Sequence, residues 1–197
     1  MADFWIFFKV GLNHVLDFNG YDHMLFLIAL TVPYVAKDWQ RILILVSFFT
    51  LGHTLSLMLS VFNVITVKAS LVELLIPITI LITAFFNLLI AGKSSKNGNM
   101  SFVASVTVFF GIIHGLGFSN YFNALLPGKP VDKVAPLLEF ALGIEAAQIV
   151  IVIAVLILSF IAQTLLRFNK RDFTLIMSSF VIGVVVPLIA QNPIWGK

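Results

Sequence analysis

ASLVELLIPITILITAFFNLLIA, the stretch at residues 69–91, contains a single charged side chain, Glu73. A helix rises about 1.5 Å per residue, so roughly 20 apolar residues cross a hydrocarbon layer of about 30 Å. A soluble core cannot use so long an uninterrupted apolar run. The stretch therefore predicts a transmembrane helix, with lipid as the solvent of the fold.

Similar runs occupy most of the chain. Of its residues, 60% are hydrophobic and only 11% are charged, whereas an average soluble domain has about 25% charged residues. The runs are long and lack the alternation of barrel strands, so helices are expected. The sequence predicts an all-α, polytopic membrane helix bundle, a single integral membrane domain over residues 1–197, with six transmembrane helices at about 22–36, 39–62, 69–91, 102–122, 136–166 and 173–190.

The basic residues lie between the apolar runs. The formal net charge of +3 therefore does not indicate a nucleic-acid partner, and the placement of these residues indicates the orientation of the chain in the membrane. Membrane lipid is an expected partner. Four basic residues are assigned to one side, Lys68, Lys129, Lys133 and Lys197, against seven in the loops after the first, third and fifth runs: Lys37, Arg41, Lys93, Lys96, Arg167, Lys170 and Arg171. Because Lys and Arg are enriched in cytoplasmic loops, we expect both termini outside. The oligomeric state is left open.

The N-terminal segment is expected to form a short helix at residues 4–16 that cannot span alone. The first predicted span is also short: from His23 to Ala36 a helix rises about 20 Å, which leaves about 10 Å of the hydrocarbon layer uncovered. A re-entrant or interfacial N-terminal helix would fill this gap. It would place the turn from His14 to His23 at about 10 Å depth, where irregular backbone is tolerated only against protein or a wet cavity.

All four histidines of the chain fall in this turn or inside spans, where ionisable groups are costly and usually functional. His53, His114 and Glu145 lie about 8 or 9 residues from the outer ends of their spans, hence about 12 to 14 Å deep. The chain has no cysteine, so nitrogen and oxygen must hold any metal. Imidazoles and carboxylates at one level predict a site for a divalent transition-metal ion, and these ligand types suit zinc, nickel, iron and copper without choosing among them. The predicted ligands are His14, Asp22, His23, His53, His114 and Glu145, supported by Asp17 and by Gln148, one turn after Glu145.

The same residues also suit simpler roles. A lone intramembrane histidine is often only a hydrogen-bond partner between helices, and Asp22 is also a candidate N-cap of its helix. Asp17 is ambiguous, and a proton relay of histidines and acids is an alternative to a metal site. Glycines inside the spans are expected to permit close helix approach, namely Gly111, Gly115, Gly117 and Gly143.

Four ordered motifs surround the histidines and acids: GYDHMLFL at residues 20–27, FTLGHT at 49–54, FGIIHGLGF at 110–118 and GIEAAQ at 143–148. Together they resemble the HupE/UreJ family of bacterial membrane proteins, and the likeness covers nearly the whole chain. The resemblance implies nickel or cobalt uptake for hydrogenase and urease and a location in the bacterial inner membrane. It also implies a role in metal handling for the family's signature histidine and its Asp-His pair, here Asp22 and His23.

The leading hypothesis is a permease or binding protein for a divalent transition-metal ion of the nickel, cobalt, zinc or copper class, with an outward-facing site in the outer half of the bilayer. Zinc or nickel is the expected ion. The inner halves of the spans offer only hydroxyl and amide groups, such as Thr83 and Asn87. This leaves a second hypothesis, an intramembrane metal-dependent hydrolase in which the metal activates water and Glu145 or Asp22 is the base. A third is an accessory membrane subunit with a structural metal.

Overall fold

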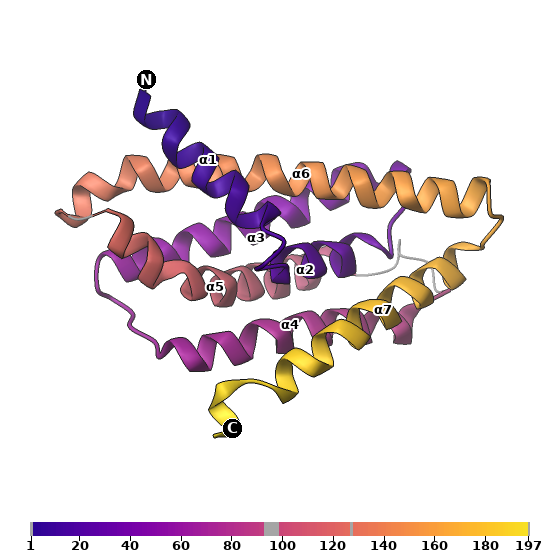
Figure 1. Cartoon of the computed structure of the whole chain (residues 1–197). Coiled ribbons are helices and arrows are strands. Elements are labelled where there is room, and N and C mark those ends of the chain that lie inside the picture. The colour runs from indigo at the N-terminus through magenta and orange to yellow at the C-terminus, as the bar shows by residue number, and fades with distance from the viewer. Residues whose placement is uncertain (1, 93–98, 127, 197) are drawn as a thin grey trace.

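The computed structural model describes residues 2–92, 99–126 and 128–196. Within these ranges the chain forms seven α-helices and no strand (Figure 1). The helices are α1 (Ala2–Leu16), α2 (Asp22–Thr31), α3 (Trp39–Val61), α4 (Ala69–Ile90), α5 (Met100–Leu125), α6 (Val134–Thr164) and α7 (Lys170–Ala190), with short 3₁₀ helices η1 (Ala36–Asp38), η3 (Pro130–Lys133) and η4 (Pro193–Trp195). The prediction of an all-α bundle is confirmed.

Five of these helices, α3 to α7, are long and apolar enough to cross a membrane. Their ends agree with the predicted spans to within three residues. The remaining predicted span, 22–36, is represented by α2, whose 10 residues rise only about 15 Å and cannot cross alone. The helix ends at Thr31, and Pro33 cannot extend it because proline has no backbone N–H to donate to the carbonyl of Ala29. The expected count of six spanning helices is therefore not confirmed, whereas the short N-terminal helix is present as α1.

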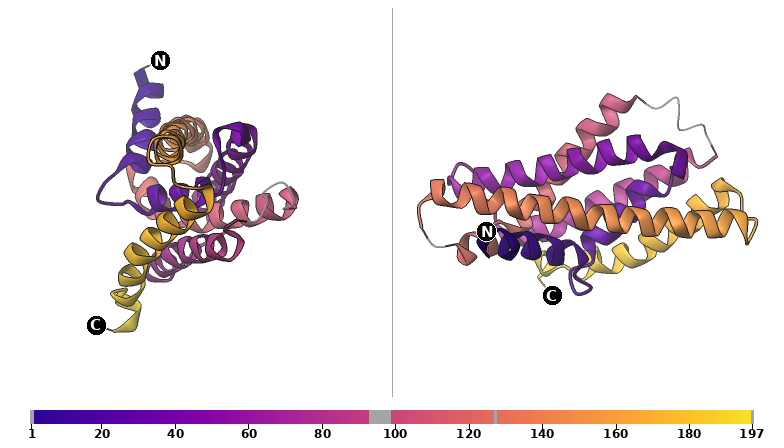
Figure 2. Two further views of the ribbon diagram at one scale, coloured as in Figure 1. Left: turned by 90° about the vertical axis from the view of Figure 1, so that its right-hand side faces the viewer. Right: turned by 90° about the horizontal axis from the view of Figure 1, so that it is seen from above.

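The long helices lie side by side along the bundle (Figures 1 and 2). The α3–α4 and α5–α6 connections lie at one end, toward which both termini also point, and the α2–α3 and α6–α7 connections lie at the other. We call these ends the termini side and the opposite side. Which of them faces the cytoplasm stays a prediction, and three of the basic residues behind it, Lys93, Lys96 and Lys197, lie outside the described residues.

Two helix pairs approach so closely that only glycine fits between them. Gly52 and Gly111 lie at the α3–α5 contact, and Gly11 and Gly143 lie at the α1–α6 contact. At each of the four positions a Cβ atom would collide with a backbone carbonyl of the partner helix. Small residues that let backbones meet are the usual way to pack helices in lipid, where the hydrophobic effect does not drive helices together. The expected packing role of Gly111 and Gly143 is thus confirmed.

Candidate metal centre

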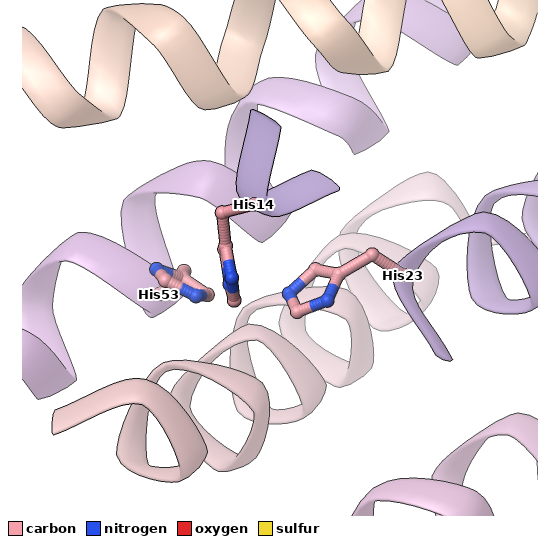
Figure 3. A group of neighbouring side chains, drawn as sticks. All are labelled: His14, His23 and His53. Atoms are coloured by element: carbon pink, nitrogen blue, oxygen red, sulfur yellow. The ribbon is translucent and has the colours of Figure 1, made fainter. Parts of the chain in front are cut away.

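The break between α1 and α2 carries two histidines to the side of α3. His14 lies in the last turn of α1, and His23 is the second residue of α2. Both rings turn toward His53 of α3 (Figure 3). The ring centroids of His14 and His23 are 4.6 Å apart, and the His53 centroid lies 5.8 Å from that of His14 and 5.6 Å from that of His23. His114 of α5 joins them, 5.1 Å from His23. Residues far apart in the sequence therefore meet at one point.

Most of these rings are sealed from solvent, yet their nitrogens are not all used. His53 is 0% exposed, and His23 and His114 are each 1% exposed. Among the described residues, five buried ring nitrogens have no hydrogen-bond partner: His14 Nε2, His23 Nε2, His114 Nδ1 and both nitrogens of His53. A buried polar atom without a partner costs free energy, and such atoms are rare in folded proteins. Five at one place indicate a group that the side chains are arranged to bind.

The carboxylate of Asp22 fixes the tautomer of His23. Its Oδ1 atom lies 3.0 Å from His23 Nδ1, and a carboxylate can only accept, so Nδ1 carries the proton. The lone pair of His23 is then on Nε2, the unpaired nitrogen. Asp22 is not the N-cap of α2, since that position is Tyr21 and makes no side-chain cap. The pairing of carboxylate with histidine is the arrangement that orients metal-binding imidazoles in proteins.

Thr79 of α4 does the same for His114. Its hydroxyl donates its one hydrogen to the carbonyl of Ile76, 2.7 Å away. The oxygen must therefore accept from His114 Nε2, at 3.0 Å. This leaves the lone pair of His114 on the unpaired Nδ1. The sequence reasoning missed Thr79, although counting about 15 Å inward from Ala69 places it at the level of the histidines.

Two overlapping sets of side chains offer ligand atoms within 4.8 Å of one another: His14, His23 and His53, and Asp22, His23 and His114. Two ligands of a tetrahedral ion with metal–nitrogen distances of about 2.0 to 2.1 Å lie about 3.3 Å apart. Each set therefore needs an inward shift of little more than about 1 Å to surround an ion. In the first set, His23 can bind an ion through its unpaired Nε2 while Nδ1 keeps the proton that it donates to Asp22.

Phenylalanine rings cover the cluster on both of its ends. On the termini side, Phe118 lies 4.0 Å from His14 between ring centroids and stacks on Phe140 at 5.0 Å. On the opposite side, Phe26 lies 5.2 Å from His114 and stacks on Phe49 at 4.6 Å. These rings hold the histidines in a low-dielectric setting, where an electrostatic interaction with a cation is strong.

A vestibule of about 740 Å³ leads from the surface to His14. Its polar lining is Asn13, His14, Asp17 and Asn19, with Phe118 and Tyr121 beside them. Asp17 is exposed and accepts a hydrogen bond from the backbone N–H of Asn19 at 2.8 Å. The vestibule therefore offers an exposed carboxylate together with the first histidine of the cluster.

Glycine places α5 against α3 at the height of the cluster. A Cβ at Gly115 would collide with the backbone of His53 and with the hydroxyl of Ser56. Gly115 therefore holds His114 close to His53, in line with its predicted role. At Gly117 a Cβ would press only on the end of the Ile76 side chain, so that position is less constrained.

Two predicted residues of α6 make other contacts. The Ser47 hydroxyl donates to Oε1 of Glu145, and Glu145 belongs to neither set of clustered ligand atoms. Gln148 is 0% exposed, and its Oε1 accepts from the Thr50 hydroxyl at 2.8 Å. The structure therefore brings together five of the six predicted ligands, His14, Asp22, His23, His53 and His114, and places Glu145 with Ser47.

Comparison with protein families gives a match over most of the chain. The family described as HupE / UreJ protein matches residues 1–191. The comparisons with curated proteins and with solved structures returned no match. The family match covers almost the whole chain, including every helix that contributes to the cluster.

Proposed function

Because the chain belongs to the HupE/UreJ family, whose members are linked to nickel and cobalt transport, we propose that it is a permease for a divalent transition-metal ion. The ion is its cargo, and the histidine cluster is the site that receives it. His14, His23 and His53 provide nitrogen ligands, and His114 and Asp22 complete the cluster from α5 and α2. The termini side, which carries the vestibule, faces the outside in this proposal.

One observation carries the proposal: in the described part of the chain, five buried imidazole nitrogens of one cluster lack a hydrogen-bond partner, and a vestibule reaches that cluster. A proton relay would be expected to link such groups by hydrogen bonds to one another. Here His23 Nδ1 is hydrogen-bonded to Asp22 and His114 Nε2 to Thr79. The unpaired nitrogens are not hydrogen-bonded to one another. This arrangement supports a metal site in which the unpaired nitrogens are ligands and Asp22 and Thr79 orient two of the imidazoles.

The donor chemistry fits nickel, cobalt and zinc alike. Neutral imidazole suits all three, and their affinities for nitrogen sites follow the Irving–Williams order. Selection among them would depend on how many of the four rings reach the ion and on the geometry they allow. Nickel and cobalt are the first ions to test because the family is linked to them.

The hydrolase hypothesis is weakened by the place of Glu145. A base must lie within hydrogen-bond reach of the metal-activated water, and Glu145 is bonded to Ser47 outside both sets of ligand atoms. Asp22 is then the carboxylate of the described clusters that could serve as base, and it is engaged by His23. A structural metal in an accessory subunit would have no need of a vestibule.

The experiment is metal uptake into liposomes that contain the purified protein and a trapped metal-sensitive dye. Wild-type protein should give protein-dependent uptake of Ni²⁺ or Co²⁺. His53→Ala should abolish it, because His53 offers two unpaired nitrogens at the centre of the cluster. Metal binding to the same samples in detergent is measured by equilibrium dialysis.

A matched control is Gln163→Ala, which removes a polar group of α6 that bonds to Ser159 on its own helix. It should leave both binding and uptake unchanged. Stoichiometric metal binding without uptake in wild-type vesicles would refute the permease and favour the structural role. Uptake by His53→Ala at the wild-type rate would refute the site.

A further inference from the structure

A second cavity lies among α2, α4, α5 and α7, on the opposite side of the bundle. Its volume is about 910 Å³. Residues at helix ends line its mouth, including Ala91, Asn99 and Asn169, so the cavity reaches the end of the bundle. Thr83 lies among its deepest lining residues, seven residues before the end of α4, which corresponds to about 10 Å along the helix axis.

Polar groups on one face of α4 lead from this cavity to the histidines. Thr79, Thr83 and Asn87 follow one another at intervals of four residues, so they share a face of the helix. The first touches the cluster through His114 Nε2, 3.0 Å from Thr79 Oγ1. Thr83 and Asn87 both line the cavity. The stripe therefore spans from the metal centre to the opposite side, and the other polar residues of α4, Ser70 and Glu73, lie in its first two turns.

A single helical turn separates the end of the cavity from the cluster. Thr83 lines the cavity, whereas Thr79 is 2% exposed and lies about 6 Å further along α4. Phe26 of α2 fills this level: it is 1% exposed, contacts the ring of His114 and stacks on Phe49. Phe26 and Phe49 thus cover the cluster on its opposite side.

Asn87 connects the stripe on α4 to α2, the helix that carries Phe26. Its amide donates to the carbonyl of Ala29 at 2.7 Å, and Ala29 lies one turn after Phe26 on α2. The helix α2 has only 10 residues and begins at the Asp22–His23 pair. A movement of this pair at the metal centre would therefore also move Phe26, which lies on the same short helix.

We propose that the Thr79–Thr83–Asn87 stripe is the path by which the ion leaves the histidine cluster for the opposite-side cavity, with Phe26 as the barrier. This inference rests on the proposed transport function. Hydroxyl and amide oxygens bind late transition metals more weakly than imidazoles do, and conduction requires sites weak enough for the ion to leave. None of the described lining residues is acidic, and Lys170 and Arg171 are among them, which favours release of a cation rather than its retention.

The chain contains no cysteine, so a single introduced thiol reports on its own position. In Thr83→Cys, a membrane-impermeant methanethiosulfonate reagent added from the opposite side should modify the thiol, and modification should remove most of the Ni²⁺ uptake. Ile82→Cys is the matched control: Ile82 is 51% exposed on the lateral surface and should remain unmodified in lipid, with normal uptake.

A second pair of variants needs no labelling. Thr83→Val and Asn87→Leu should lower uptake while equilibrium Ni²⁺ binding in detergent stays at the wild-type level, since neither residue belongs to the ligand sets. Absence of uptake by wild-type vesicles would overturn the transport function and the path with it. If wild-type vesicles take up the ion normally and Thr83→Cys vesicles still do so after complete modification, the path alone would be overturned.

Discussion

Thr79→Val tests the arrangement of the metal centre at a residue that does not itself bind the ion. Valine keeps the shape of threonine at a position that is 2% exposed, so packing is preserved and only the hydroxyl is lost. In the wild-type protein that hydroxyl donates to Ile76 and accepts from His114 Nε2. The substitution therefore removes the acceptor that keeps the proton of His114 on Nε2.

The magnitude follows from the cost of an unpaired buried donor. To offer Nδ1 to a metal, His114 must carry its proton on Nε2, and in the variant that N–H has no acceptor. The cost is about 1 to 3 kcal/mol. Without metal the ring can move its proton to Nδ1 and avoid part of this cost, so the penalty falls mainly on the metal-bound state. The expected loss is roughly 5- to 150-fold in metal affinity, similar to the about 10- to 100-fold seen for other residues that support metal ligands.

The assay is equilibrium dialysis of Ni²⁺ against purified protein in detergent, with Thr79→Ser as the control that retains the hydroxyl. The serine variant should bind nearly as tightly as wild type. Thermal unfolding with and without metal provides a second measure, because a ligand that binds the folded state raises the midpoint more the tighter it binds. Wild-type affinity in Thr79→Val, or equal losses in the valine and serine variants, would refute the assigned role of Thr79.

Three further outcomes are expected. Metal binding should weaken as the pH falls, because protons compete with the metal for the imidazole lone pairs; dialysis that gives the same affinity at about pH 7 and about pH 5 would contradict a histidine site. Gly111→Ala should lower the unfolding free energy by about 1 to 3 kcal/mol through overpacking against α3, whereas Gly183→Ala, where a Cβ meets nothing within 4 Å, should be neutral or stabilising by up to about 1 kcal/mol in thermal unfolding. Glu145→Gln should retain full metal stoichiometry by elemental analysis, since the carboxylate contacts Ser47, and a loss of bound metal would place Glu145 back among the ligands.

The sequence determined the five long helices and the positions of His53 and His114 along them. The fixed rise per residue converts the length of an apolar run into a span and the position of a residue into a depth. For this reason the long helices start and end close to where the sequence predicts, and His53 and His114 could be expected at one level. The glycines of α5 also pointed correctly to close packing, because a missing Cβ has the same consequence wherever two helices meet.

Only the tertiary structure decided which groups at that level meet. A depth count gives the height of a residue on its helix and says nothing of the direction in which the finished bundle turns it. Glu145 and His53 were predicted at equal depth, yet the carboxylate pairs with Ser47 while the imidazole enters the cluster. Thr79 lies at the same level, but no local sequence pattern predicts its contact with His114. The two residues are 35 positions apart in the chain, and the rotation and packing of whole helices decide whether they meet.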